Sequence, residues 1–184
     1  MKLKEVFSIE FIDKLNRIND GANLDPDLEV NGFIDIKDIL KALNFEVEFE
    51  DNMMGSGKIN GNRIIIDSSE NSARQRFSMA HELGHAVQND RNANRNDDSE
   101  DYSSEDRRKE VFANTFAAQF LMPKVLVKEA INESITQNGF DRLKLTPNNI
   151  DTIVSEVSAK LGVSKIAMKY RIENLNIFIP AKEQ

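Results

Sequence analysis

His81-Glu82-Leu83-Gly84-His85 is the stretch that decides how this chain is interpreted, and it contains the only two histidines in the sequence. On an α-helix, residues i and i+4 project from one face about one turn apart, so both imidazoles can reach a single metal ion. Glu82 projects roughly 100° around the axis from His81, where its carboxylate can approach a metal-bound water without binding the metal. The spacing therefore predicts a metal site; the alternative is two ordinary histidines on a helix.

The residues around the two histidines indicate a helix that is buried on most sides. Apolar residues cover a broad arc of its helical wheel, and the remaining stripe is filled by polar residues: Arg74, Ser78, His81, His85 and Gln88. A polar stripe on a buried helix is expected to face a cleft. Ser72, with Gln75 three residues later, forms a capping-box pattern that predicts the start of this helix. Gly84 lowers helix propensity, and its missing side chain would permit close packing or substrate approach beside the metal.

A third metal ligand has to be a carboxylate or a weaker group, because the chain has no cysteine and no further histidine. Glu110 lies on a predicted helix over 105–122, whose surroundings are apolar and which stops at Pro123. A carboxylate on a packed helix needs a partner, and a metal ion would provide one. Asn114, four residues on, is placed to orient Glu110 or a histidine. The alternative is that Glu110 only begins the exposed part of its helix after the basic run 107–109.

Two segments together resemble the ImmA/IrrE family of metallopeptidases: RFSMAHELGH (76–85) and EVFANTFAAQFLMP (110–123). The resemblance covers roughly residues 33–175. It implies an α+β, zincin-like fold in which a small antiparallel sheet lies over the motif helix. It also implies zinc as the cofactor, with these residues at the site: His81, His85 and Glu110 as ligands and Glu82 as general base.

The chemistry that such a site supports is hydrolysis. Two imidazoles and one carboxylate leave a fourth tetrahedral position open for water, which is typical of a catalytic zinc site. Glu82 is then expected to accept the proton of the attacking water. The same ligands accept manganese or another divalent ion. A side chain that stabilises the oxyanion is harder to assign: Tyr102, Tyr170 and Arg171 are the candidates, and Tyr170 and Arg171 are equally interpretable as structural.

Outside the motif, periodicity and turn signals predict further helices and a small sheet. The helices are predicted at 8–19, 34–43, 105–122, 125–138, 147–161 and 165–174. The alternating segment 45–50 predicts a half-buried strand, and Asn60-Gly61 predicts a hairpin between two further strands. The polar segment 89–106 predicts a long loop, which would serve as a lid, as a substrate-docking element, or remain disordered.

The chain is expected to divide into three parts. Residues 1–32 form an N-terminal helix and loop, 33–138 the zincin-like catalytic domain, and 139–184 a helical segment packed on it. This last part resembles a helix-turn-helix, which raises DNA binding through 147–175 as an alternative role. A net charge of −7 argues against it, because phosphate contact needs a concentrated basic face.

The resemblance implies an intracellular zinc endopeptidase of narrow specificity. Its substrate would be a helix-turn-helix repressor of a mobile element or stress regulon, encoded nearby, whose cleavage relieves repression. The alternative is a non-catalytic, metal-containing regulatory module, antitoxin-like or DNA-binding; Glu82 argues against it, because a structural zinc site needs no base. Without a signal-type start or an apolar run near the ~20 residues of a membrane span, and without cysteine, a cytoplasmic protein with no membrane partner is expected.

Overall fold

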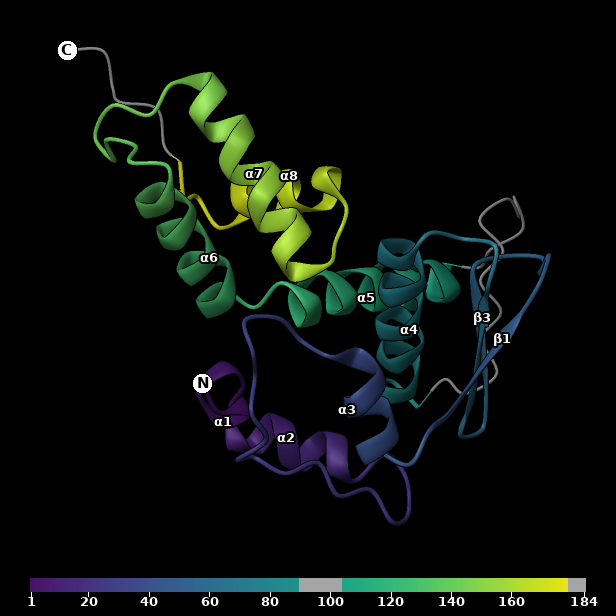
Figure 1. Ribbon diagram of the computed structural model, residues 1–184. Helices are drawn as coiled ribbons and strands as arrows, with labels where there is room; N and C mark the ends of the chain where they lie inside the picture. The colour runs from purple at the N-terminus through teal and green to yellow at the C-terminus, as the bar shows by residue number, and fades with distance from the viewer. Residues whose placement is uncertain (90–103, 179–184) are drawn as a thin grey trace.

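The computed structural model describes residues 1–89 and 104–178. Within these ranges the chain forms eight helices and one three-stranded sheet (Figure 1), in the order α1 (Leu3–Val6), α2 (Ile9–Asn16), α3 (Ile36–Ala42), β1 (Glu46–Glu50), β2 (Gly57–Asn60), β3 (Arg63–Asp67), α4 (Ser72–Val87), α5 (Ser104–Leu121), α6 (Lys124–Gln137), α7 (Pro147–Leu161) and α8 (Lys165–Asn174). Helix α4 contacts α3, α5, β2 and β3, so it occupies the centre of the fold. This arrangement confirms the predicted α+β class.

Helix α4 carries both histidines and is buried from residue 78 to residue 86, as its apolar arc predicts. Its N-cap is Asn71, whose side-chain oxygen accepts a hydrogen bond from the backbone N–H of Arg74. The predicted capping box is therefore wrong. Ser72 is the first helical residue, and Gln75 donates instead to the carbonyl oxygens of Ser68 and Glu70. Asparagine and serine cap equally well, so two adjacent candidates leave the start of a helix undecided.

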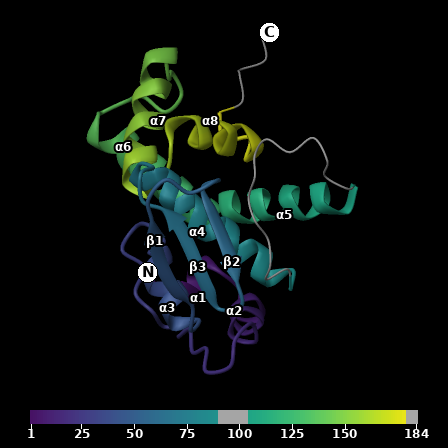
Figure 2. The same ribbon diagram turned by 90° about the vertical axis from the view of Figure 1, so that its right-hand side faces the viewer.

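The sheet is mixed, which corrects the prediction of an antiparallel sheet. Strand β3 lies in the middle; β2 pairs with it antiparallel and β1 pairs with it parallel. The cause is the connection 51–56, which passes the end of β3: the N–H of Asp67 donates to Ser56, and the N–H of Ser68 donates to Glu50. Figure 2 shows the three strands in front of α4.

The predicted hairpin joins β2 to β3, with its turn one residue later than expected. Asn60 pairs with Arg63, so Gly61 and Asn62 form the turn, and Gly61 adopts a φ of 63° that glycine tolerates without strain. Strand β1 is more exposed than predicted, because it lies at the edge of the sheet. Its Phe49 is 44% exposed.

One hydrophobic cluster extends through the described residues, from Leu3 in α1 to Ile172 in α8. It includes the inward-facing side chains of the sheet, such as Ile64 and Ile66, which are completely buried. The predicted division into three parts stays a prediction beside this continuous core. Among the helices of residues 1–89 and 104–178, none has both the length and the apolar character that crossing a membrane requires.

Arg76 of α4 joins segments that are far apart in the sequence. Its guanidinium donates to the carbonyl oxygens of Ile34, Leu161 and Gly162 at 2.7, 3.3 and 3.1 Å. Burial lowers the pKa of this guanidinium, and the charge of Asp35 opposes that change. Arg76 thereby connects the motif helix to the N-terminal segment and to the end of α7.

Candidate metal centre

The centre forms where α4 and α5 cross at very short range. Gly84 allows this crossing, because a Cβ atom at that position would lie 3.0 Å from the Cα atom and 3.3 Å from the carbonyl oxygen of Ala113. Ala113 is itself completely buried. Of the two roles considered for Gly84, close packing is the one that the structure supports.

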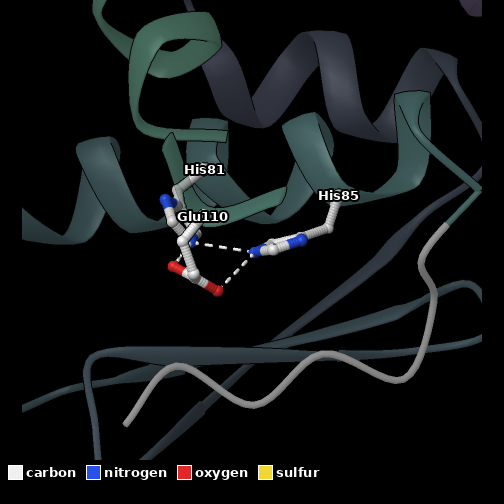
Figure 3. Close-up of side chains that lie close together, drawn as sticks. All are labelled: His81, His85 and Glu110. Atoms are coloured by element: carbon white, nitrogen blue, oxygen red, sulfur yellow. Dashed lines mark hydrogen bonds and ion pairs between the residues drawn. The ribbon is translucent and has the colours of Figure 1, made fainter. Parts of the chain in front are cut away.

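The crossing brings three potential ligands together (Figure 3). His81 and His85 come from α4 and Glu110 from α5, and each offers one ligand atom within 4.8 Å of the others. The two Nε2 atoms are 3.1 Å apart. Glu110 Oε2 lies 3.4 Å from His81 Nε2, and Glu110 Oε1 lies 3.2 Å from His85 Nε2.

These distances fit one zinc ion. Ligand atoms about 2.0–2.1 Å from a tetrahedral zinc lie about 3.4 Å from one another, close to the three separations observed. Nitrogen and carboxylate oxygen are also the donor atoms that a catalytic zinc site takes when cysteine is absent. His81 and His85 are almost completely buried, at 0% and 1% exposure, whereas the Glu110 side chain is 23% exposed. The group is therefore reached from solvent on the Glu110 side.

Asn114 orients the first of these histidines. Its side-chain oxygen lies 3.0 Å from His81 Nδ1, and because an amide oxygen only accepts, Nδ1 is the donor. A neutral His81 then presents the lone pair of Nε2 to the centre, as a metal ligand must. Asn114 acts on a histidine, which is one of the two roles predicted for it.

Glu110 carries its negative charge throughout the physiological range. Burial by itself raises the pKa of the carboxyl group, but hydrogen bonds and charge interactions with His81 and His85 outweigh burial and lower the pKa to about 2. An ionised carboxylate facing two imidazoles is the state in which Glu110 binds a cation.

Glu82 lies outside the group of three ligands, although it is on the same helix. Its side chain is completely buried and is directed to strand β2, where a Cβ atom on Gly57 would meet Glu82 Oε1 at 3.0 Å. Only a residue without a side chain leaves this much room for the carboxylate. The position next to two metal ligands, but outside their cluster, suits a general base.

Comparison with protein families identifies the family to which a chain with this site belongs. A family model for Peptidase M78, described as an IrrE N-terminal-like domain, matches residues 44–173, which is more than half of the chain and includes the whole centre. The chain belongs to Peptidase M78. The predicted ImmA/IrrE resemblance is confirmed, and the chain is of the metallopeptidase kind that this family represents. Comparison with curated proteins finds no match.

Two of the predicted oxyanion candidates of this Peptidase M78 chain, Tyr170 and Arg171, lie among the described residues. Arg171 donates from Nε to the carbonyl oxygen of Met122 at 2.9 Å, after the end of α5, and burial lowers its pKa. Tyr170 is 64% exposed and borders a pocket near the start of α4. Tyr102 and most of the predicted loop 89–106 lie outside the described residues.

One site feature of the Peptidase M78 domain was not singled out from the sequence. Gly57 adjoins the carboxylate of Glu82, and a glycine next to a strand gives no signal of its own contact. Arg74, by contrast, was predicted to lie on the polar stripe with the histidines; it precedes His81 by seven residues on α4, and its guanidinium donates to Ser56 Oγ at 3.1 Å. The helical spacing of Arg74 from the histidines is the signal that marks it as part of the same face.

Proposed function

We propose that this Peptidase M78 protein is a zinc-dependent endopeptidase of narrow specificity. The observation that carries the proposal is the convergence of His81, His85 and Glu110 on one point while Glu82 stands outside their group. A site that only stabilised the fold would need its ligands but would have no use for a buried carboxylate beside them.

Each residue of the site has a separate role in the proposed hydrolysis. Zinc, when bound, lowers the pKa of water and polarises the scissile carbonyl. His81, His85 and Glu110 hold the ion, and Asn114 keeps His81 in the ligand tautomer. Glu82 accepts the proton of the attacking water and passes it to the leaving amine. Packing against Gly57 of β2 restricts the positions that the Glu82 carboxylate can take.

The substrate, in this proposal, is a helix-turn-helix repressor encoded near this protein, and cleavage relieves repression inside the cell. Membership of the IrrE-like family supports this choice. So does the limited access to the centre, where both histidines are buried and only Glu110 is partly exposed. Such a site favours a specific, locally unfolded segment over folded proteins in general.

The alternative, direct DNA binding through 147–175, has less support. Lys165 Nζ lies 2.7 Å from one carboxylate oxygen of Asp151, and Lys169 Nζ lies 3.5 Å from the other. Asp151 of α7 thus offsets cations that a helix-turn-helix would direct to phosphates. Arg171, the remaining candidate on α8, donates to the backbone of this chain.

Co-expression with the neighbouring regulator tests the proposal. The wild type, Glu82→Gln and the exposed surface variant Glu129→Gln are each expressed with it, and new N-termini are mapped by mass spectrometry. We expect cleavage with the wild type and with Glu129→Gln, and none with Glu82→Gln. Purified Glu82→Gln is expected to retain one zinc per chain, whereas His85→Ala and Glu110→Ala lose it.

Each result has a separate meaning. Full cleavage by Glu82→Gln would contradict its role as the base. Zinc retained by both His85→Ala and Glu110→Ala would contradict the ligand set. A regulator that stays intact with the wild type would remove the repressor as substrate, while zinc-dependent cleavage of other peptides would leave the endopeptidase activity in place.

A further inference from the structure

A hollow lies beside the first half of α4, the helix that carries both histidines. It has a volume of about 430 Å³ and is enclosed by the first half of α4 on one side and by α8 with the α7–α8 turn on the other. Phe77 and Arg74 line it from α4, and Ile166, Ala167 and Tyr170 line it from α8.

The walls of this hollow are mainly apolar. Phe77, Met122, Val163 and Ala167 contribute hydrocarbon or ring surface, and Met122 at the base is 1% exposed. Ile166 and Tyr170 are 68% and 64% exposed, so part of the apolar surface of the hollow faces solvent. A large apolar side chain is the ligand that would bury this surface.

The polar groups at the edge of the hollow are engaged within the protein. Arg74 donates to Ser56 Oγ at 3.1 Å and lies 3.5 Å from the carboxylate of Glu70. The Asn71 side-chain oxygen caps α4 through the N–H of Arg74. The charge at the edge is thus balanced, and the apolar walls determine which ligand the hollow prefers.

The hollow adjoins the metal centre through Phe77. This ring lines the hollow, and its centroid is 6.4 Å from the centroid of the His81 imidazole. Phe77 precedes His81 by four residues and Arg74 precedes it by seven, so all three lie along one face of α4. A peptide bound at the metal centre and extended toward the start of α4 would pass directly over the hollow.

We propose that this hollow is a specificity subsite that takes a large apolar side chain of the peptide substrate, with Phe77, Ala167, Ile166 and Tyr170 as its selecting residues. The inference rests on the proposed endopeptidase function. Helical rise places Phe77 about 6 Å and Arg74 about 10 Å from His81 along the axis. Because an extended peptide advances about 3.3 Å per residue, the selected side chain belongs to a residue two or three positions from the scissile bond.

Cleavage of a peptide mixture tests the subsite directly. Peptides prepared from a bacterial proteome are incubated with the zinc-loaded wild type, Ala167→Phe, Ile166→Asp and Ala159→Phe, and the new termini are identified by mass spectrometry. Ala167→Phe fills the hollow and Ile166→Asp places a charge in its wall. Ala159→Phe is the matched control, because Ala159 is exposed on α7 and does not line the hollow.

The wild type and Ala159→Phe are expected to favour leucine, isoleucine, methionine or phenylalanine two or three positions from the cut. Ala167→Phe should lower kcat/KM for those peptides about 10- to 100-fold, with unchanged zinc content. Ile166→Asp, at an exposed position that tolerates polar residues, should shift the preference toward lysine and arginine. Identical preferences in all four proteins would overturn the proposal.

A binding measurement separates the subsite from the peptidase activity. Zinc-loaded Glu82→Gln is immobilised, the same peptide mixture is passed over it, and the retained peptides are sequenced beside those retained by Glu82→Gln/Ala167→Phe. Retention of apolar peptides by the first protein and not by the second supports the subsite, even if the wild type cleaves nothing and the proposed function fails. Equal retention by both proteins rejects the subsite, even if the wild type is an active peptidase.

Discussion

Gly84 of α4 and Ala113 of α5 approach so closely that a Cβ atom on Gly84 would lie 3.0 Å from the Cα atom of Ala113. The two helices therefore cross backbone against backbone. This crossing sets the separation between the histidines of α4 and the carboxylate of Glu110 on α5. The candidate metal centre of this protein therefore depends on a residue that has no side chain and no chemistry of its own.

Gly84→Ala should weaken metal binding more than it weakens the fold. Alanine raises helix propensity by about 1 kcal/mol, while overpacking against Ala113 costs about 1–3 kcal/mol, so the free energy of unfolding changes little. Displacement of α5 should nevertheless raise the zinc Kd at least about tenfold, or about 1.4 kcal/mol, as measured by chelator competition. Adding Ala113→Gly should restore only part of the affinity, because the Cα and carbonyl oxygen of residue 113 remain in contact.

Asn114→Ala should lower zinc affinity about 10- to 100-fold, because His81 loses the acceptor that fixes its tautomer. Asn114→Asp keeps an acceptor at the same place and should retain most of the affinity. Thr115→Ala is the matched control, since Thr115 is exposed and bonds only within its helix, to Val111. Competition with a chromogenic chelator gives the three affinities; equal values for Asn114→Ala and Thr115→Ala would remove Asn114 from the site.

Gly57→Ala should reduce kcat while leaving zinc content unchanged. The added methyl group would lie 3.0 Å from Glu82 Oε1 and 3.2 Å from Ile66, so the carboxylate has to move. We expect a loss of about tenfold or more, since a misplaced base loses much of its catalytic contribution. Lys58→Ala, at the next position of β2, is the control. If Gly57→Ala lost zinc along with activity, its effect would be structural and the positioning argument would fail.

Arg76→Ala should lower the free energy of unfolding by about 2–4 kcal/mol, because three carbonyl oxygens from distant segments lose a charged donor. Arg76→Lys should recover only part of this stability, since an ammonium group cannot reproduce the planar array of donors. Arg142→Ala, which removes an exposed hydrogen bond to Asn132, should change stability by less than about 0.5 kcal/mol. Urea denaturation of the zinc-free proteins measures all three values.

The helices after the motif could be predicted from the sequence nearly to the residue. Thr146 and Pro147 start α7, Gly162 ends it in a left-handed conformation, and Ser164 caps α8, as observed. Each of these capping signals involves residues within about one helical turn of each other, so it can be recognised in a short stretch of sequence. The parallel pairing of β1 could not be predicted in this way, because it depends on how the loop 51–56 passes β3.

The site also combines contacts that local sequence patterns predict with contacts between distant segments that they do not. The spacing of His81 and His85 on one helix predicts their proximity, and the family resemblance adds Glu110, which the structure places beside both. The contact of Gly57 with Glu82 joins a strand to a helix 25 positions later, and no local pattern encodes it. Arg171 has the charge of an oxyanion stabiliser, yet its packing directs it to the end of α5.

The hydrogen bonds of Arg76 also impose an order on biosynthesis. Their acceptors belong to residue 34 and to residues 161 and 162, so α4 acquires its full set only when the chain has been made to Gly162. Translation proceeds at about 5–20 residues per second. Several seconds therefore pass between the synthesis of the histidine helix and the formation of the hydrogen bonds from Arg76 to Leu161 and Gly162. A chain truncated before Leu161 would carry His81, His85 and Glu110 but would lack two of the three acceptors of Arg76, so the histidine helix would be held less firmly.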